Sequence, residues 1–158
     1  MQPVSRATVE AFYQAYMMRD AARVAPLLDD DIDWVISGPI DIMPFCGQRR
    51  GKSAVLELVD RRLPKTLEAM SFHPETLLID GDRAAMLATL SAVLTKDRHK
   101  VRYRLAHFLR FRDSKLIEFR SIIDTFDAAE QILGHSIDLS PRRDLAEGPE
   151  RGDHLFAV

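Results

Sequence analysis

The chain has 158 residues, with 22 Lys and Arg against 24 Asp and Glu, so its formal net charge is −2 at pH 7. Hydrophobic residues make up 46% and charged residues 29%, which is ordinary globular usage and excludes a wholly disordered chain. This near-neutral balance supplies no broad field for nucleic acid or an anionic membrane, so we expect neither as a partner. One cysteine, Cys46, allows no disulfide within the chain. Because the first residues contain no apolar signal core, we expect a cytoplasmic protein.

The first part of the chain has mainly helical spacing. Residues 5–19 are predicted to form an amphipathic helix, because its apolar residues recur three and four positions apart. This stripe consists of Val9, Phe12, Tyr13, Tyr16 and Met17. Asp20 is the predicted N-cap of a short second helix that includes Leu28. A first strand is expected over 32–36, and a further helix over 52–63 follows a loop rich in glycine and proline.

From residue 67 onwards the apolar residues alternate with a period of two. This pattern predicts four strands that short polar turns join as consecutive hairpins, at about 67–79, 83–96, 100–112 and 115–125. A short helix is expected from Asp127 to Gly134. Residues 1–134 are therefore predicted to be one α+β domain. Residues 135–158 are predicted to be an irregular C-terminal extension, whose apolar end either docks on the domain or a second subunit or stays loose.

Several stretches resemble the nuclear transport factor two-like superfamily. They are residues 9–20, 45–55 and 111–120, together with an Asp124 that precedes the Gln-Ile-Leu-Gly of residues 131–134, a pattern similar to that of SnoaL-like proteins. The superfamily includes ketosteroid isomerases, limonene-epoxide hydrolases and SnoaL-like polyketide cyclases. The resemblance covers residues 5–134 and implies a cone-shaped, curved, mostly antiparallel sheet with helices packed on its concave face, a cystatin-like α+β barrel. It also implies an apolar pocket and frequent dimers, but no single reaction.

The ketosteroid isomerase residue set is incomplete in this sequence. At the position of the family's first-helix tyrosine stands Phe12, which has no hydroxyl. Asp33 could supply the first-strand base, but Trp34 on the opposite face belongs to the side that looks buried. The later aspartic acid, which the family keeps neutral in an apolar site, is replaced by His107, or by Ala106 if the alignment has no gap. We therefore do not expect the usual isomerase mechanism.

The limonene-epoxide hydrolase residue set is also missing. That mechanism needs an arginine and an aspartate two residues apart on a middle strand, and residues 84–94 contain no charged residue in any register. The second aspartate of that family falls at about Ser121. No shift of the alignment restores the set, so this mechanism is excluded more firmly than the first.

His107 is the strongest catalytic candidate that remains. It shares the more apolar parity of its strand with Tyr103, Leu105 and Leu109, which predicts that it faces the core. An imidazole there could act as general acid or base, because its unperturbed pKa is about 6.5. The alternative is a core histidine that hydrogen-bonds a hydroxyl or a backbone carbonyl. The opposite face carries Arg102, Arg104 and Arg110, which fit a salt-bridged sheet surface or a dimer interface.

The other polar candidates also have purely structural interpretations. Tyr16 could hold a carbonyl oxygen, or be core with a solvated tip. Asp124 could orient a histidine, or cap the following helix. We therefore predict a catalytic set of His107, Tyr16 and Asp124. The predicted ligand-binding residues are Phe12, Trp34, Ile36, Phe119 and Ser121. No cluster has metal-ligand spacing, so we expect no metal and no cofactor.

These residues lead to two hypotheses about function. The first is an isomerase- or cyclase-like enzyme that binds a small apolar carbonyl compound in the cone pocket and moves a proton through His107. The second is a non-catalytic module that binds such a molecule and has His107 as a core residue. In either case we expect a homodimer that forms through the sheet.

Overall fold

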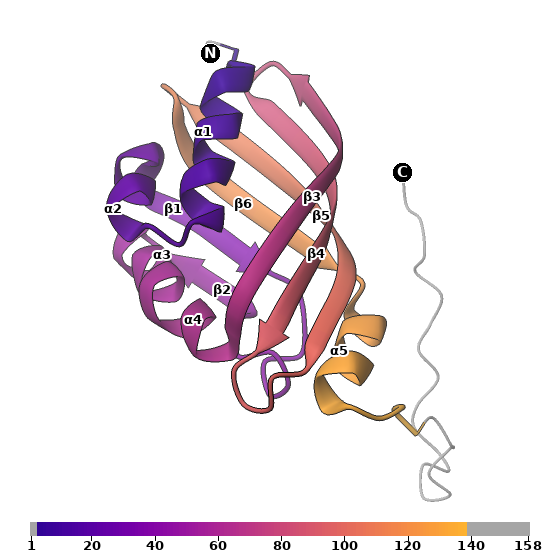
Figure 1. Cartoon of the computed structure of the whole chain (residues 1–158). Helices are drawn as coiled ribbons and strands as arrows, with labels where there is room; N and C mark the ends of the chain where they lie inside the picture. Colours follow the sequence, from indigo (N-terminus) through magenta and orange to yellow (C-terminus); the bar gives the residue numbers. More distant parts are fainter. Residues whose placement is uncertain (1–2, 139–158) are drawn as a thin grey trace, which may run out of the picture.

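The computed structural model describes residues 3–138, so the expected docking of the chain's apolar end lies outside the described residues. Helices come first and most strands second, as the sequence predicts (Figure 1). The elements are α1 (Arg6–Met17), α2 (Ala21–Val24), η1 (Ala25–Leu27), β1 (Leu28–Ile36), β2 (Gly47–Arg50), α3 (Lys52–Glu57), η2 (Leu58–Arg62), α4 (Leu63–Thr66), β3 (Leu67–Asp80), β4 (Arg83–Leu94), β5 (Lys100–Arg112), β6 (Lys115–Ile123) and α5 (Thr125–Leu133).

The strands form one six-stranded sheet in the order β2-β1-β6-β5-β4-β3. Every neighbouring pair is antiparallel except β1 and β6, which run parallel. The sheet curls, and α1 to α4 lie on its concave side, whereas α5 lies near the start of β5 (Figure 1). This arrangement confirms the predicted α+β cone with a mostly antiparallel sheet and with the hairpins β3–β4, β4–β5 and β5–β6.

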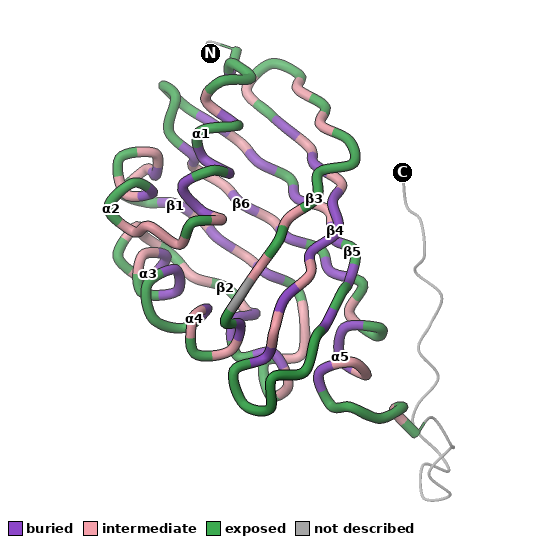
Figure 2. Tube along the Cα trace, in the orientation of Figure 1, coloured by how far each residue is buried: buried purple, intermediate pink, exposed green. Residues whose placement is uncertain are grey.

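Helix α1 packs its predicted apolar stripe against the sheet. The hydroxyl of Ser5 accepts a hydrogen bond from the backbone N–H of Thr8 at 3.0 Å and so caps the first turn. Val9, Phe12 and Tyr16 are buried, whereas Gln14 on the other side of the helix is exposed. Burial also alternates along β4 and β5 (Figure 2), so the concave face of the sheet and the stripe of α1 form one core.

Three element boundaries differ from the sequence prediction. Leu28 begins β1 and does not belong to the second helix. Strand β2 lies within the stretch predicted as a loop; it is a short edge strand with no buried residue, so it lacks the apolar alternation that marks the others. The helix predicted to end at residue 63 continues through a π-helical segment to Thr66. Pro64 is tolerated because it lies in the first turn of α4.

The antiparallel part of the sheet has two edges without a neighbouring strand, and their backbones have different surroundings. β3 forms the outer edge and contains Pro74, next to a register shift between Pro74 and Thr76. The first residues of β5 extend beyond the last residue of β6, and there Gln131 of α5 pairs with the backbone of Arg102.

No helix between residues 3 and 138 is both long enough and apolar enough to cross a membrane.

Candidate functional site

Strand register brings the predicted ligand-binding residues together on the concave face. Trp34 of β1 pairs with Phe119 of β6. In the next row Ile36 pairs with Ser121, and Ser121 pairs with His107 of β5. All five side chains are buried, with at most 4% of each residue exposed. The sequence therefore predicted correctly that Trp34, Ile36 and His107 face the interior.

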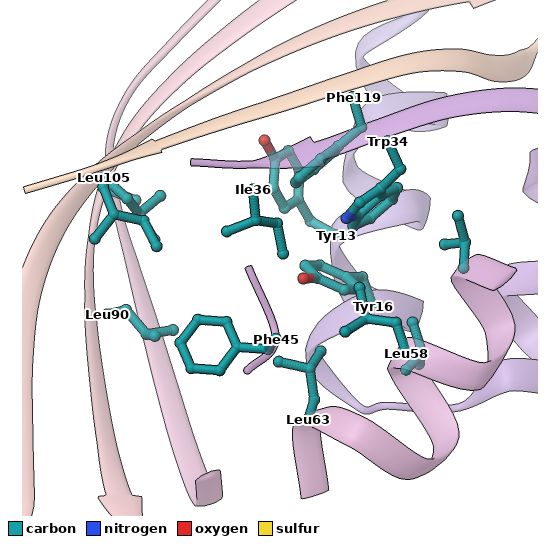
Figure 3. Packing of buried hydrophobic residues seen from close by; sticks show 14 of the residues in the cluster. Tyr13, Tyr16, Trp34, Ile36, Phe45, Leu58, Leu63, Leu90, Leu105 and Phe119 are labelled. Carbon is teal, nitrogen blue, oxygen red and sulfur yellow. The ribbon is translucent and has the colours of Figure 1, made fainter. Parts of the chain in front are cut away.

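Aromatic rings fill this part of the interior. The rings of Trp34 and Phe119 stack in parallel, with centroids 3.7 Å apart. Phe12 of α1 covers them from above the sheet, at 6.2 Å from Trp34 and 6.1 Å from Phe119. Figure 3 shows the rings of Trp34 and Phe119 near aliphatic side chains such as that of Ile36. The residues predicted to line a pocket thus contact one another directly.

His107 lies inside an aromatic cage. Only 3% of the residue is exposed, and its ring centroid is 4.7 Å from that of Phe119 and 6.0 Å from that of Phe72. The ring is nearly parallel to that of Tyr13, at an interplanar angle of 4°. Because burial penalises the charged imidazolium, the pKa of His107 falls to about 3. The imidazole is therefore neutral at pH 7.

Tyr13 is the polar partner of His107, a role that the sequence analysis missed. Its hydroxyl lies 3.1 Å from His107 Nδ1, although the two residues are 94 positions apart in the chain. Burial raises the pKa of Tyr13 far above its ordinary value, so the phenol keeps its proton. Tyr13 was visible only as a member of the apolar stripe of residues 5–19. No local pattern could connect it to a particular histidine.

This pair can exist in two hydrogen-bonded forms, since a neutral imidazole carries its proton on either nitrogen. If Nδ1 carries the proton, it donates to the Tyr13 oxygen, and the Tyr13 O–H is then free to donate elsewhere. If Nε2 carries the proton, the Tyr13 hydroxyl donates to Nδ1. The pair can therefore respond to a neighbouring group without forming a charge.

A second group of donors comes from Trp34 and Tyr16. The indole N–H of Trp34 is fully buried and has no hydrogen-bond acceptor within the described part of the chain. The Tyr16 ring meets the Trp34 ring edge-on at 5.3 Å. In Figure 3 the Trp34 nitrogen and the Tyr16 hydroxyl both point toward the side of the interior where Ile36 lies. Burial also raises the pKa of Tyr16, so its hydroxyl remains a donor.

Asp124 lies apart from this interior cluster. It is exposed at the start of α5, and its backbone N–H donates to the carbonyl of Arg104 at 3.0 Å. Across residues 3–138 no hydrogen bond joins its carboxylate to His107 or to the first turn of α5. The structure thus brings together His107, Tyr16 and the ligand-binding residues but not Asp124.

A groove of about 400 Å³ leads to Tyr13 from outside. It runs between α1 and strands β3 and β4, and its apolar wall includes Phe72, Leu77 and Met86 as well as Tyr13. Tyr13 thus has one side toward His107 and another toward this groove. Within residues 3–138, no three His, Cys, Asp or Glu side chains are grouped so that they could hold a metal ion.

Comparison with known proteins places this geometry in a family. A family model described as a SnoaL-like domain matches residues 9–119, most of the chain. The chain belongs to the SnoaL-like family. A proposed isomerase from Rhodopseudomonas palustris, known from a crystal structure, is 32% identical in sequence to this SnoaL-like chain. The match covers 84% of this chain and 100% of the isomerase chain, with a TM-score of 0.77. No curated protein matches the sequence.

More distant structures share the fold alone. An LEH-like epoxide hydrolase from M. tuberculosis is 19% identical, with 81% of this chain and 88% of that chain covered and a TM-score of 0.65. A protein with a ketosteroid isomerase-like fold from Catenulispora acidiphila, in complex with trimethylamine, is 14% identical. It covers 87% of this chain and 100% of its own, with a TM-score of 0.69. The SnoaL-like chain therefore has isomerase-like and epoxide hydrolase-like structural neighbours.

Proposed function

We propose that this SnoaL-like protein binds a small, mostly apolar carbonyl compound inside the cone. The observation that carries the proposal is the buried Trp34 N–H, which lacks an acceptor within the described residues. A buried donor without a partner costs about 1–3 kcal/mol, and a carbonyl oxygen would remove that cost. The Tyr16 hydroxyl, which points to the same side, supplies a second donor (Figure 3). The surrounding side chains are hydrocarbon, which suits an apolar ligand body.

The same arrangement supports proton-transfer chemistry of the isomerase or cyclase class. Two donors that hold a carbonyl oxygen stabilise the negative charge that develops when the adjacent carbon loses a proton. The neutral His107 in the neighbouring row would take that proton and return it to another carbon, so that the product is an isomer of the substrate. Tyr13 would hold the imidazole in position. The 32% identity to a proposed isomerase supports this class.

A specific observation favours the alternative, a non-catalytic binding module. Full burial lowers the pKa of His107 to about 3, which makes it a weak base near neutral pH. Its Nδ1 atom is also already bonded to Tyr13. In this reading His107 is a satisfied core residue, and only the Trp34 and Tyr16 donors contact the ligand.

Binding is tested by a thermal-shift screen of ketones, lactones and aromatic polyketide-like compounds, followed by titration calorimetry of the hits. A ligand at a hundred times its dissociation constant stabilises a protein by about 2.7 kcal/mol, so true hits are easy to detect. We expect Trp34→Phe and Tyr16→Phe each to weaken a carbonyl hit about tenfold. Arg23→Gln, an exposed change on α2, should leave the affinity unchanged. Hits that ignore Trp34→Phe would overturn the proposed donor.

Catalysis is tested separately by proton exchange. A bound ketone hit is dissolved in D2O, and NMR follows the loss of hydrogen from the carbon beside the carbonyl. If the protein is an enzyme, the wild type should accelerate this exchange. His107→Leu should abolish the acceleration but still bind the ketone. Exchange no faster than in buffer, with binding intact, supports the binding module.

We also propose that the protein forms a homodimer through the outer face of the sheet. Phe108 and Ile122 are about half exposed there, 50% and 52%, and Leu78 on the same face is 64% exposed. The Arg104–Glu75 ion pair also lies on this face. In a two-fold dimer, Arg104 of one copy would then lie near Glu75 of the other. Light scattering after gel filtration should give twice the monomer mass for the wild type and the monomer mass for Phe108→Glu.

A further inference from the structure

A second groove lies away from the aromatic interior. This groove has a volume of about 510 Å³. Its wall residues come from strands β3, β4 and β5 and helix α5. Figure 1 shows that α5 lies at the end of the sheet where β5 begins. Its volume is in the range of small-molecule sites. The proposed function does not use it, and none of its wall residues belongs to the His107 or Trp34 clusters.

Two cations in the wall of this groove have no carboxylate partner among residues 3–138. Lys100 and Arg102 lie on the outer face of β5 and are exposed. Farther along the same face, Arg104, Arg110 and Arg112 pair with Glu75, Asp82 and Asp29. Within the described residues the side chains of Lys100 and Arg102 make no such ion pair. In the described part of the chain, carboxylates thus pair with the cations of β5 outside the groove but not with the two inside it.

The rest of the wall combines hydroxyl groups with hydrocarbon. Strand register sets Ser71, Ser91 and Arg102 in one row across β3, β4 and β5. Val93 pairs with Lys100 in the next row, and Met70 adds further apolar surface. One end of the groove can therefore hold an anion through charge-assisted and hydroxyl hydrogen bonds, and the remainder can cover an apolar body.

Gln131 fixes the position of Arg102. Its side-chain carbonyl accepts from the Arg102 N–H at 2.7 Å, and its side-chain N–H donates to the Arg102 carbonyl at 2.7 Å. The same amide nitrogen also donates to Asp127. Because these bonds use both ends of the amide, Gln131 forms a rigid wall of the groove and holds the backbone that carries the guanidinium.

We infer that this groove is a second binding site, for an organic carboxylate that carries an apolar chain or ring. The carboxylate pairs with Lys100 and Arg102 and accepts from the serine hydroxyls, while the apolar part lies over Met70 and Val93. This site is independent of the carbonyl site in the cone. A ligand that has only the carboxylate or only the apolar part leaves half of the groove without a matching group.

The test is titration calorimetry of the full chain with octanoate, with octanol and acetate as probes that carry only one of the two features. We expect octanoate to bind with a dissociation constant below about 1 mM, octanol and acetate at least tenfold more weakly, and the octanoate affinity to fall as salt rises. Arg102→Gln and Lys100→Gln should each weaken octanoate about tenfold. Arg112→Gln is the matched control on the same face, outside the groove, and should leave the octanoate affinity unchanged.

Several outcomes would overturn the inference. They are no saturable octanoate binding up to about 10 mM, octanol that binds as tightly as octanoate, or an Arg112→Gln effect equal to that of Arg102→Gln. Light scattering that shows a dimer dissolved by Arg102→Glu would assign the groove to a second copy of the chain instead. Octanoate binding that Trp34→Phe abolishes while Arg102→Gln does not would place the carboxylate in the cone. Failure of the carbonyl screen has no bearing on these readouts.

Discussion

The two faces of β5 give their polar side chains different kinds of partner. On the inner face the residues from Val101 to Phe111 are at most 6% exposed, and the polar His107 is neutral and paired with a neutral phenol. On the outer face charged arginines pair with carboxylates in contact with water. The comparison teaches that solvation decides which partner a polar group takes: a neutral hydrogen bond where desolvation is costly, and an ion pair where it is not.

The largest expected difference between the faces is in packing. Leu109→Ala removes a side chain that is 3% exposed and should lower the free energy of unfolding by about 2–5 kcal/mol. Arg112→Ala, three residues further on the outer face, should cost less than about 1 kcal/mol. Urea denaturation of both variants measures the contrast. Equal losses would mean that the outer face contributes packing as important as that of the core.

The neutral state of His107 predicts a pH dependence. Its pKa is about 3 in the folded chain, below the value of about 6.5 expected when unfolded, so the unfolded state binds the extra proton as pH falls. The stability present above pH 6.5 is therefore lost progressively toward pH 3, at up to about 1.4 kcal/mol per pH unit. Urea denaturation from pH 7 to 4 should show this loss in the wild type beyond that of His107→Leu, in which the carboxylates titrate as before. Parallel curves would mean that folded His107 accepts a proton readily.

An intermediate effect is expected at the edge of β5. Gln131→Leu removes two hydrogen bonds to the backbone of Arg102 and should cost about 1–2 kcal/mol. Hydrogen exchange of the Arg102 amide should accelerate more than that of Tyr103, its neighbour in the strand. Glu130→Gln, one residue earlier in the same helix, is the control for effects on α5 itself. Unchanged exchange at Arg102 would mean that Gln131 does not protect this edge.

The smallest effect is expected for an outer ion pair. Arg104→Gln breaks the exposed pair with Glu75 and should change the free energy of unfolding by less than about 1 kcal/mol. The difference from the wild type should shrink further in 1 M salt, where the Debye length is about 3 Å. A larger loss that salt does not reduce would show that this pair acts as part of a buried network.

Much of the fold could be predicted because it depends on local patterns. The stripe of α1 and the alternation along β1 and β5 indicate which residues face inward, and this placed Phe12, Trp34 and His107 in one interior. Strand β2 could not be predicted, because an edge strand held by pairing with β1 needs no apolar pattern. The superfamily resemblance supplied the cone shape that the patterns alone do not give.

The candidate site was harder to predict because its contacts join distant parts of the chain. Parity shows that His107 faces inward but cannot show that Tyr13 meets it. A salt-bridged sheet surface was one expectation for the arginines of β5, but the sequence does not show that Arg110 pairs with Asp82 in the β3–β4 turn. Which charge reaches which partner depends on the curvature of the sheet and on side-chain length, and neither is encoded in alternation.

Pro74 has a consequence for how this chain behaves at high concentration. A 14-residue strand at the rim of a sheet offers a row of free backbone groups that could template pairing with another molecule. A proline has no N–H to offer, and the neighbouring register shift bends the strand away from a flat edge. The exposed Glu75 beside it adds a charge. This rim of the molecule is thus protected against growth into an extended intermolecular sheet.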